Sequence, residues 1–276
     1  MSHAIYDGLS IGETFQMLAN LYRHGPESVP QPISFRSYLL HTKGRDRAES
    51  YAYWSETLRG STLTTVPCAD PHAAGPPTIL GLSVSVPLPP FGITPASLFT
   101  FACASAFRRV AATDDVVFGR VVAGRASVPA ELQGTVGPCL NRVPVRLQFA
   151  PGGTRAELLA SLQRQHIESL PHETLGLAEI VKTCCVPACA PGTREFGCWV
   201  QYQNIEENPV VEFWEGDKTM MKNQEAWHVP KSPDFLEIFA IQTDKDSLTV
   251  RLIGGAGYSE GLLTDLLKLV CSELQG

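Results

Sequence analysis

The sequence predicts an α/β domain built around a mixed sheet. Helical and strand-like patterns are interspersed along the chain without an internal repeat, which is typical of such domains. Residues 116–122 form an apolar, β-branched run that indicates a central strand. With 276 residues, of which 44% are hydrophobic and 18% charged, the chain is long and apolar enough to bury a sizeable core.

Charge and hydropathy exclude several classes of partner. The net charge is -6 and no run of lysine or arginine is present, which argues against nucleic acid or an anionic membrane as the main partner. No apolar run is long enough to span a bilayer. The first residues have neither the basic nor the apolar region of a secretory signal, so we expect a cytoplasmic location.

Capping signals predict the helices of the first half. Ser10 can cap a first helix, with Glu13 completing a capping box. A second helix is expected over residues 45–58, where apolar residues recur at helical spacing and a glycine follows. Thr94 caps a third helix, and Pro95 occupies its first position.

The second half repeats these signals. Thr154 and Glu157 form a second capping box, which opens a helix through about Ser169. Ser259 caps the last helix. Alternating or continuous apolar patterns predict six strands: residues 80–86, 116–122, 143–149 and 197–202, and a hairpin formed by 235–242 and 248–253.

The motif with the clearest chemistry lies at the start of the chain, where His3, Asp7 and Gly8 follow the pattern His-x-x-x-Asp-Gly. An imidazole titrates near neutrality and can accept a proton from an attacking amine or hydroxyl. The acid can tie the loop down, and the glycine allows a tight turn. The pattern occurs often by chance, so alone it is weak evidence for catalysis.

Two other features carry alternatives. Arg125 follows a predicted strand and a glycine, so it can either pair with Asp7 as a bidentate ligand or lie in solvent. Four cysteines are crowded in one region: Cys184, Cys185, Cys189 and Cys198. They could form a zinc site, but reduced thiols are the favoured interpretation. We therefore predict no metal.

Several stretches together resemble the condensation domains of nonribosomal peptide synthetases, in particular the terminal condensation-like domains of fungal synthetases. The first is Ser2-His3-Ala4-Ile5-Tyr6-Asp7-Gly8, with serine in place of the family's first histidine. The others follow in the family's order along nearly the whole chain: residues 35–38 with 53–58, residues 115–125, residues 136–146, residues 171–175 and residues 200–204.

This resemblance implies a chloramphenicol-acetyltransferase-like lobe with a mixed sheet and flanking helices. It implies that residues 1–276 are a single lobe, the C-terminal one, with the motif and first helix in residues 1–25. In the family the motif follows a complete N-terminal lobe, which we expect to be absent here. His3 would orient or deprotonate the nucleophile, or stabilise the tetrahedral species, and Asp7 would pair with Arg125. The peptide N–H near Gly8 would help to hold the oxyanion.

The resemblance also implies a substrate channel and its partners. Candidate channel residues are Asn141, Tyr202 and Asn204. A peptidyl carrier protein would bring a peptide or natural-product intermediate on its own phosphopantetheine, so this chain would bind no cofactor. A second copy of the chain, or a separate N-terminal-lobe chain, would supply the missing wall. The reaction would form an amide or ester bond, including intramolecular cyclisation and release.

Two other functions remain open from the sequence. A truncated, non-catalytic lobe could bind a carrier protein or an intermediate and template its cyclisation by shape. A soluble acyl-CoA transferase shares the fold and the His-x-x-x-Asp motif, and residues 195–199 faintly resemble a second motif of that group. Because those residues run directly into the condensation-like stretch 200–204, we favour the condensation reading.

Overall fold

The computed structural model describes residues 4–184, 196–204, 210–214, 216, 219–220, 232–244 and 246–276. Its chain divides into two compact units. The motif unit comprises residues 1–46, 123–141 and 205–227, and the sheet unit comprises residues 47–122, 142–204 and 228–276.

Helices and short strands make up the motif unit. Its elements are α1 (Gly8–His24), η1 (Pro26–Ser28), α2 (Phe35–Gly44), α5 (Ala130–Gln133), β5 (Val210–Val211) and β6 (Thr219–Met220). A small apolar cluster lies between α2 and the segment around α5, and it contains Tyr38, Val128 and Cys139.

The sheet unit contains a six-stranded mixed sheet in the order β1-β8-β7-β4-β2-β3. The central pairs β2–β4 and β4–β7 are parallel, whereas β7–β8 and β1–β8 are antiparallel. The strands are β1 (Thr78–Ser85), β2 (Asp115–Val122), β3 (Asn141–Gln148), β4 (Cys198–Gln203), β7 (Leu236–Asp244) and β8 (Ser247–Gly254). The expected α/β fold with a mixed sheet is thus confirmed.

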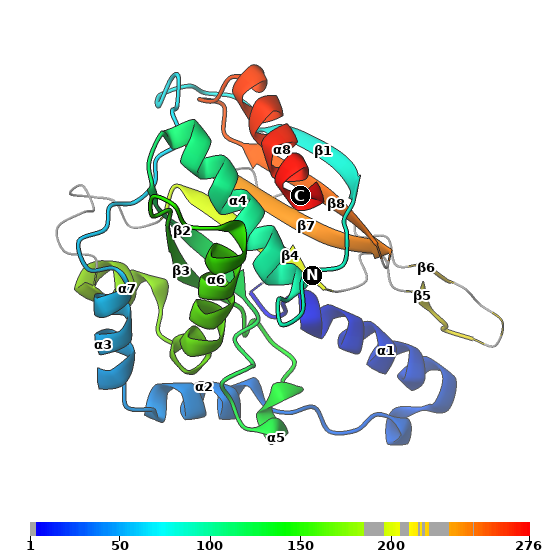
Figure 1. Cartoon of the computed structure of the whole chain (residues 1–276). Coiled ribbons are helices and arrows are strands. Elements are labelled where there is room, and N and C mark those ends of the chain that lie inside the picture. Colours follow the sequence, from blue (N-terminus) through cyan, green and yellow to red (C-terminus); the bar gives the residue numbers. More distant parts are fainter. Residues whose placement is uncertain are drawn as a thin grey trace. The chain divides into compact units, whose positions relative to one another are not determined.

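Helices cover both faces of this sheet. The helices are α3 (Ala48–Thr57), α4 (Pro95–Ala111), α6 (Arg155–Ser169), η2 (Leu170–His172), α7 (Leu177–Cys184) and α8 (Glu260–Gln275). Side chains of α4, α6 and α8 share one core cluster, and Figure 1 shows these three helices on the same face. Side chains of α3 and α7 share the other cluster.

The alternation of β2 explains why the sheet has two cores. Val116 and Phe118 belong to the cluster under α4, whereas Val117 belongs to the cluster under α3 and α7. Successive side chains of a strand point to opposite faces, so a continuous apolar run is required when both faces are covered. Residues 116–122 therefore form a strand that is buried on both faces, as the sequence predicts, but its place is next to the edge strand β3 and not at the centre of the sheet.

Two helix predictions need correction. The first helix begins at Gly8, not at Ser10, because Asp7 is its N-cap and Ser10 is the third helical residue of the capping box. Helices α2 and α7 were not predicted as separate elements, since α2 is short and largely polar and α7 has only eight residues. The predicted caps at Thr94, Thr154 and Ser259 are all present.

Candidate active-site motif and its arginine clamp

Asp7 fixes the motif at the N-terminus of α1. Its backbone is extended, and its carboxylate accepts a hydrogen bond from the backbone N–H of Ser10 at 3.0 Å. The Ser10 hydroxyl lies 2.9 Å from the backbone N–H of Asp7, which donates to it. The first N–H groups of a helix lack partners within the helix, so this reciprocal pair determines where α1 starts.

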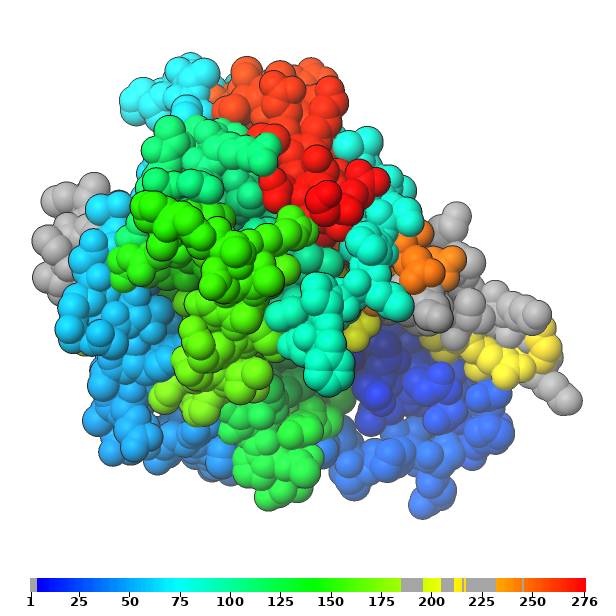
Figure 2. Space-filling model, in the orientation of Figure 1, coloured from blue at the N-terminus to red at the C-terminus, as the bar shows by residue number. Residues whose placement is uncertain are grey.

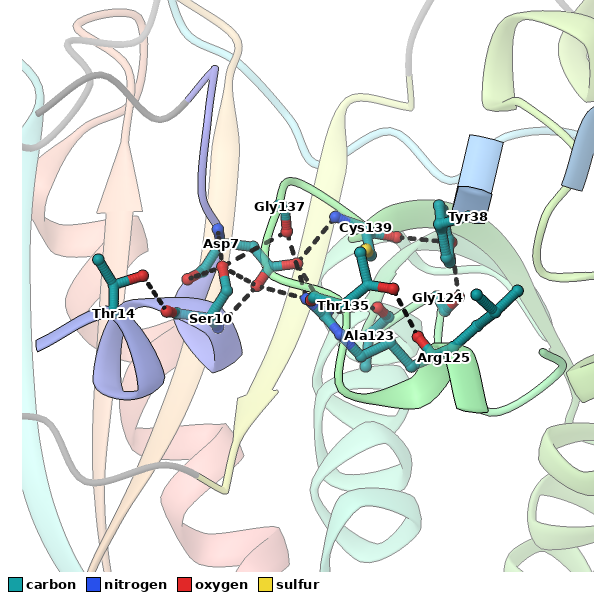
Figure 3. Close-up of polar contacts among 11 residues, drawn as sticks. Asp7, Ser10, Thr14, Tyr38, Ala123, Gly124, Arg125, Thr135, Gly137 and Cys139 are labelled. Carbon is teal, nitrogen blue, oxygen red and sulfur yellow. Dashed lines mark hydrogen bonds and ion pairs between the residues drawn. The ribbon is translucent and has the colours of Figure 1, made fainter. Parts of the chain in front are cut away.

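The second partner of Asp7 is the guanidinium of Arg125. Nη1 of Arg125 donates to Oδ2 at 2.7 Å, and Nη2 donates to Oδ1 at 3.0 Å (Figure 3). The backbone N–H of Cys139 donates to Oδ2 at 2.9 Å. Both charged side chains are buried, with Asp7 only 2% exposed. The structure therefore forms the bidentate pair that the sequence allows.

Arg125 also holds the turn in which it lies. Its guanidinium donates to the backbone carbonyls of Ala123, Thr135 and Gly137 at 2.9 to 3.2 Å. The guanidinium thus joins Asp7 to two backbone segments, one at Ala123 and one at residues 135–137. Lysine could not reproduce this fork of donors, because its ammonium is a single point of charge.

Gly124 lets these segments approach one another. Its φ angle of 66° is left-handed, and a Cβ at this position would lie 1.9 Å from the carbonyl oxygen of Cys139. The hydroxyl of Tyr38 donates to the carbonyl of Gly124 at 2.6 Å and lies 3.2 Å from the carbonyl oxygen of Cys139. Glycine is therefore required by both conformation and space.

The contacts of Asp7 decide its chemical role. Burial acts to raise the pKa of this carboxyl, but hydrogen bonds from Arg125 and Ser10 and the charge of Arg125 hold the pKa below its ordinary value of 3.8. Five donor contacts occupy its two oxygens. A carboxylate held in this way is a poor proton carrier, so the geometry favours a positioning role over proton transfer.

The remaining motif residues are placed only in part. His3 lies outside the described residues. Gly8 is the first residue of α1 and is half-buried. Its N–H is one of the helix-terminal groups that have no partner further back in the helix, and it lies where the helix dipole favours negative charge.

Of the three channel candidates, Asn141 lies in the motif unit, whereas Tyr202 and Asn204 lie in the sheet unit. Asn141 begins β3 and is half-buried. Tyr202 lies near the carboxyl end of β4, where its hydroxyl donates to Oε1 of Gln242 at 3.0 Å and its ring lies beside Phe99. Asn204 is exposed directly after β4. Tyr202 and Asn204 thus lie at the same end of β4.

Metal-ligating groups do not cluster in the described part of the chain, where no set of three or more His, Cys, Asp or Glu side chains could hold an ion. Cys184 and Cys198 are buried free thiols, while Cys185 and Cys189 lie outside the described residues. No helix within the described residues is long and apolar enough to cross a membrane.

The arginine clamp consists of Asp7 and Arg125 with the groups that hydrogen-bond to them or to the turn at Gly124. Sequence reasoning missed three of these groups. Ser10 was predicted to cap the helix, although its spacing of three residues from Asp7 is the capping-box signal. Tyr38 lies in the helix that was not predicted separately, and the backbone N–H of Cys139 carries no side-chain signal. Backbone donors of this kind emerge only when distant segments are brought together.

Comparison with known proteins gives a consistent result. A sequence profile of the family described as "Condensation domain" matches residues 90–250. Curated relatives include the PF 1022-synthetase of Rosellinia sp., 34% identical over the whole of this chain, and the cyclosporin synthetase of Tolypocladium inflatum, 36% identical over 82% of it. The chain spans only 9% and 2% of these two proteins.

Solved structures match over the full length of the chain. The structure described as holo T3CT superposes with a TM-score of 0.81 at 26% sequence identity. The superposition covers all of this chain and 61% of the chain of holo T3CT. The first condensation domain of the calcium-dependent antibiotic synthetase, in complex with a substrate analogue, has a TM-score of 0.69 at 19% identity, which supports the fold alone.

Proposed function

Because the chain belongs to the condensation-domain family, we propose that it takes part in acyl transfer between carrier-bound intermediates, forming an amide or ester bond. The observation that carries this proposal is the clamp of Asp7 by Arg125, which fixes the end of the His-x-x-x-Asp-Gly motif at the start of α1. Five donor contacts hold the buried carboxylate of Asp7 in one place, so this end of the motif is pre-organised.

In this proposal His3 takes the proton of an attacking amine or alcohol. The nucleophile bonds to the thioester carbonyl carbon, and the carbon–sulfur bond breaks as the tetrahedral species collapses. The proton then passes to the leaving thiolate, so an amide or ester and a free thiol result. The N–H of Gly8, at the positive end of α1, would stabilise the oxyanion.

Asp7 and Arg125 would act as positioning residues. Their task is to hold the four-residue turn between His3 and α1 in one conformation, which reduces the entropy lost when the nucleophile is aligned. Asn141, Tyr202 and Asn204 remain candidates for contact with the substrate. Intramolecular cyclisation with release of the product is the form of the reaction that the resemblance to fungal terminal domains favours.

The partners belong to the same proposal. A peptidyl carrier protein would present the donor on phosphopantetheine, and this chain would bind no cofactor of its own. The chain covers 61% of the structure described as holo T3CT. We propose that the rest of the channel comes from a second copy, from a separate chain or from further sequence of the same protein, in the cytoplasm.

A donor-exchange experiment tests this function. The chain is mixed with a carrier protein loaded with a peptidyl thioester and with an amine nucleophile, and the amide is quantified by mass spectrometry. We expect amide formation above the rate without the chain, and no increase when free acyl-coenzyme A replaces the loaded carrier. Equal or faster transfer from free acyl-coenzyme A would instead support the acyl-CoA transferase function.

A further inference from the structure

Strand β1 forms one edge of the six-stranded sheet. Within the described residues, β8 is the only strand that pairs with it. The backbone N–H of Val86 donates to the carbonyl of Asp246 at 2.9 Å, so every second residue before Val86 faces β8 and the residues between them face outward. In Figure 2 the turquoise segment after β1 lies on the surface beside the red C-terminal helix.

The outward side of β1 is a short, unbroken row of backbone donors and acceptors. Its members are all exposed, and they are Ile79, Gly81, Ser83 and Ser85. Their outward N–H and C=O groups make no hydrogen bond within the described part of the chain. The next positions in the same alternation are Pro77 and Pro87, which have no N–H to donate and so end the row. Such a row is a template for a further strand.

The opposite edge of the sheet is protected, whereas β1 is not. Strand β3 contains Pro144 and the charged side chains of Arg142 and Arg146. Proline and charged side chains are common means by which proteins prevent a sheet edge from pairing with another chain. By contrast, residues 71–107, which include β1 and the segments on both sides of it, contain no aspartate, glutamate, lysine or arginine.

We infer that this edge pairs with β1 of a second copy of the chain, antiparallel and across a two-fold axis. The row between the two prolines has Leu82 at its midpoint, so an inverted copy pairs with the complete row only when Leu82 lies on the axis. Ile79 then pairs with Ser85 of the second copy, and Gly81 pairs with Ser83 of the second copy. Because the segment is uncharged, two copies meet along it without like-charge repulsion.

The exposure of Leu82 supports the same arrangement. Leu80 and Val84 pack in the core cluster that α8 shares, and alternation places Leu82 on that face of β1 as well. Leu82 is nevertheless 42% exposed, since no described strand lies beyond β1. In the dimer the two Leu82 side chains contact each other across the axis and extend both cores. Because β3 is protected, the pairing closes at two copies and does not continue into a fibre.

The mass of the chain in solution tests this inference. The measurement needs no substrate, so its outcome is independent of the proposed acyl transfer. Light scattering during size-exclusion chromatography should give twice the mass of one chain. A wild-type chain that stays monomeric up to millimolar concentration would overturn the inference, and a strand of a different protein would then be the occupant of this edge.

A charge at position 82 distinguishes this contact from others. Leu82→Lys and Leu82→Glu should each weaken dimerisation by more than about a hundredfold, because two like charges would face each other on the axis. An equimolar mixture of the two variants should form dimers again. The matched control is Ile167→Lys, at a 58% exposed position of α6, which should leave the dimer intact. Unchanged dimers of Leu82→Lys, or a mixture that stays monomeric, would refute the contact.

A cross-link tests the register without introducing charge. In an antiparallel pair that is not hydrogen-bonded, the two Cα atoms lie about 4.5 Å apart, which suits a disulfide. Leu82→Cys should therefore form a covalent dimer when oxidised glutathione takes up the two electrons of the thiols, whereas the wild type gives the background of the native cysteines. Ser83→Cys should not exceed that background, because Ser83 pairs with Gly81 of the second copy. Cross-linking of Leu82→Cys that does not exceed that of Ser83→Cys would overturn the inference.

Discussion

Replacing Arg125 by methionine tests the clamp most severely. The variant keeps an unbranched apolar stem but removes the guanidinium, and with it five hydrogen bonds, two of them to Asp7. Removing one partner of a buried ion pair costs about 3–5 kcal/mol, because the other charge stays buried. Asp7 keeps the donors of Ser10 and Cys139, so we expect a loss of about 3 kcal/mol.

Urea unfolding followed by circular dichroism measures this loss. With a slope of about 2–3 kcal/mol per molar, the midpoint should fall by roughly 1 M. The matched control is Arg59→Met, since Arg59 is 75% exposed in its pair with Glu56 and should contribute less than about 1 kcal/mol.

A double-variant cycle separates the pair from other effects of the substitution. If Arg125 acts through Asp7, the change Asp7→Asn should destabilise the Arg125→Met protein less than it destabilises the wild type, by at least about 1 kcal/mol. Additive losses, or a midpoint for Arg125→Met that moves no further than that of Arg59→Met, would refute the clamp.

Three further predictions concern the same fold. Gly124→Ala should cost more than about 2 kcal/mol in urea unfolding, because its Cβ would overlap the carbonyl of Cys139, whereas Gly12→Ala, with open space around it, should be neutral or stabilising. Tyr38→Phe should cost about 1 kcal/mol by the same measurement, and no loss would contradict the role of its hydroxyl. Burial lowers the pKa of His166 from 6.5 to about 4, so stability should fall as the pH decreases from 6.5 toward 4. His166→Asn should flatten that slope, and an unchanged slope would assign it to other groups.

The sequence predicts those elements whose signals are local. The caps at Thr94 and Thr154 are set by residues three positions apart, and β2 is marked by a continuous apolar run. By contrast, α2 buries little apolar surface and has no side-chain cap, so neither periodicity nor capping marks it. Its place in the fold depends on Tyr38, whose hydroxyl reaches the turn at Gly124.

The candidate site likewise has parts with a local sequence signal and parts without one. The spacing of Asp7 and Gly8 and the strand-end position of Arg125 are visible in the sequence, so their pairing could be expected. Other contacts have no local signal: His166 of α6 is half-buried, and its ring nitrogen Nδ1 lies 3.4 Å from the Ser97 hydroxyl of α4. The packing of α6 on α4 is a long-range contact, and the helical pattern of either segment alone does not reveal it.

The central claim, that the clamped motif presents His3 for acyl transfer, is tested most directly by the rate of amide formation from a carrier-bound thioester in the wild type and in His3→Ala. Both proteins should unfold at the same urea concentration, since the described contacts that hold Asp7 come from Ser10, Arg125 and Cys139. The account predicts at least a hundredfold loss of product in His3→Ala. Turnover equal to that of the wild type would contradict it and would favour a lobe that directs cyclisation by shape alone.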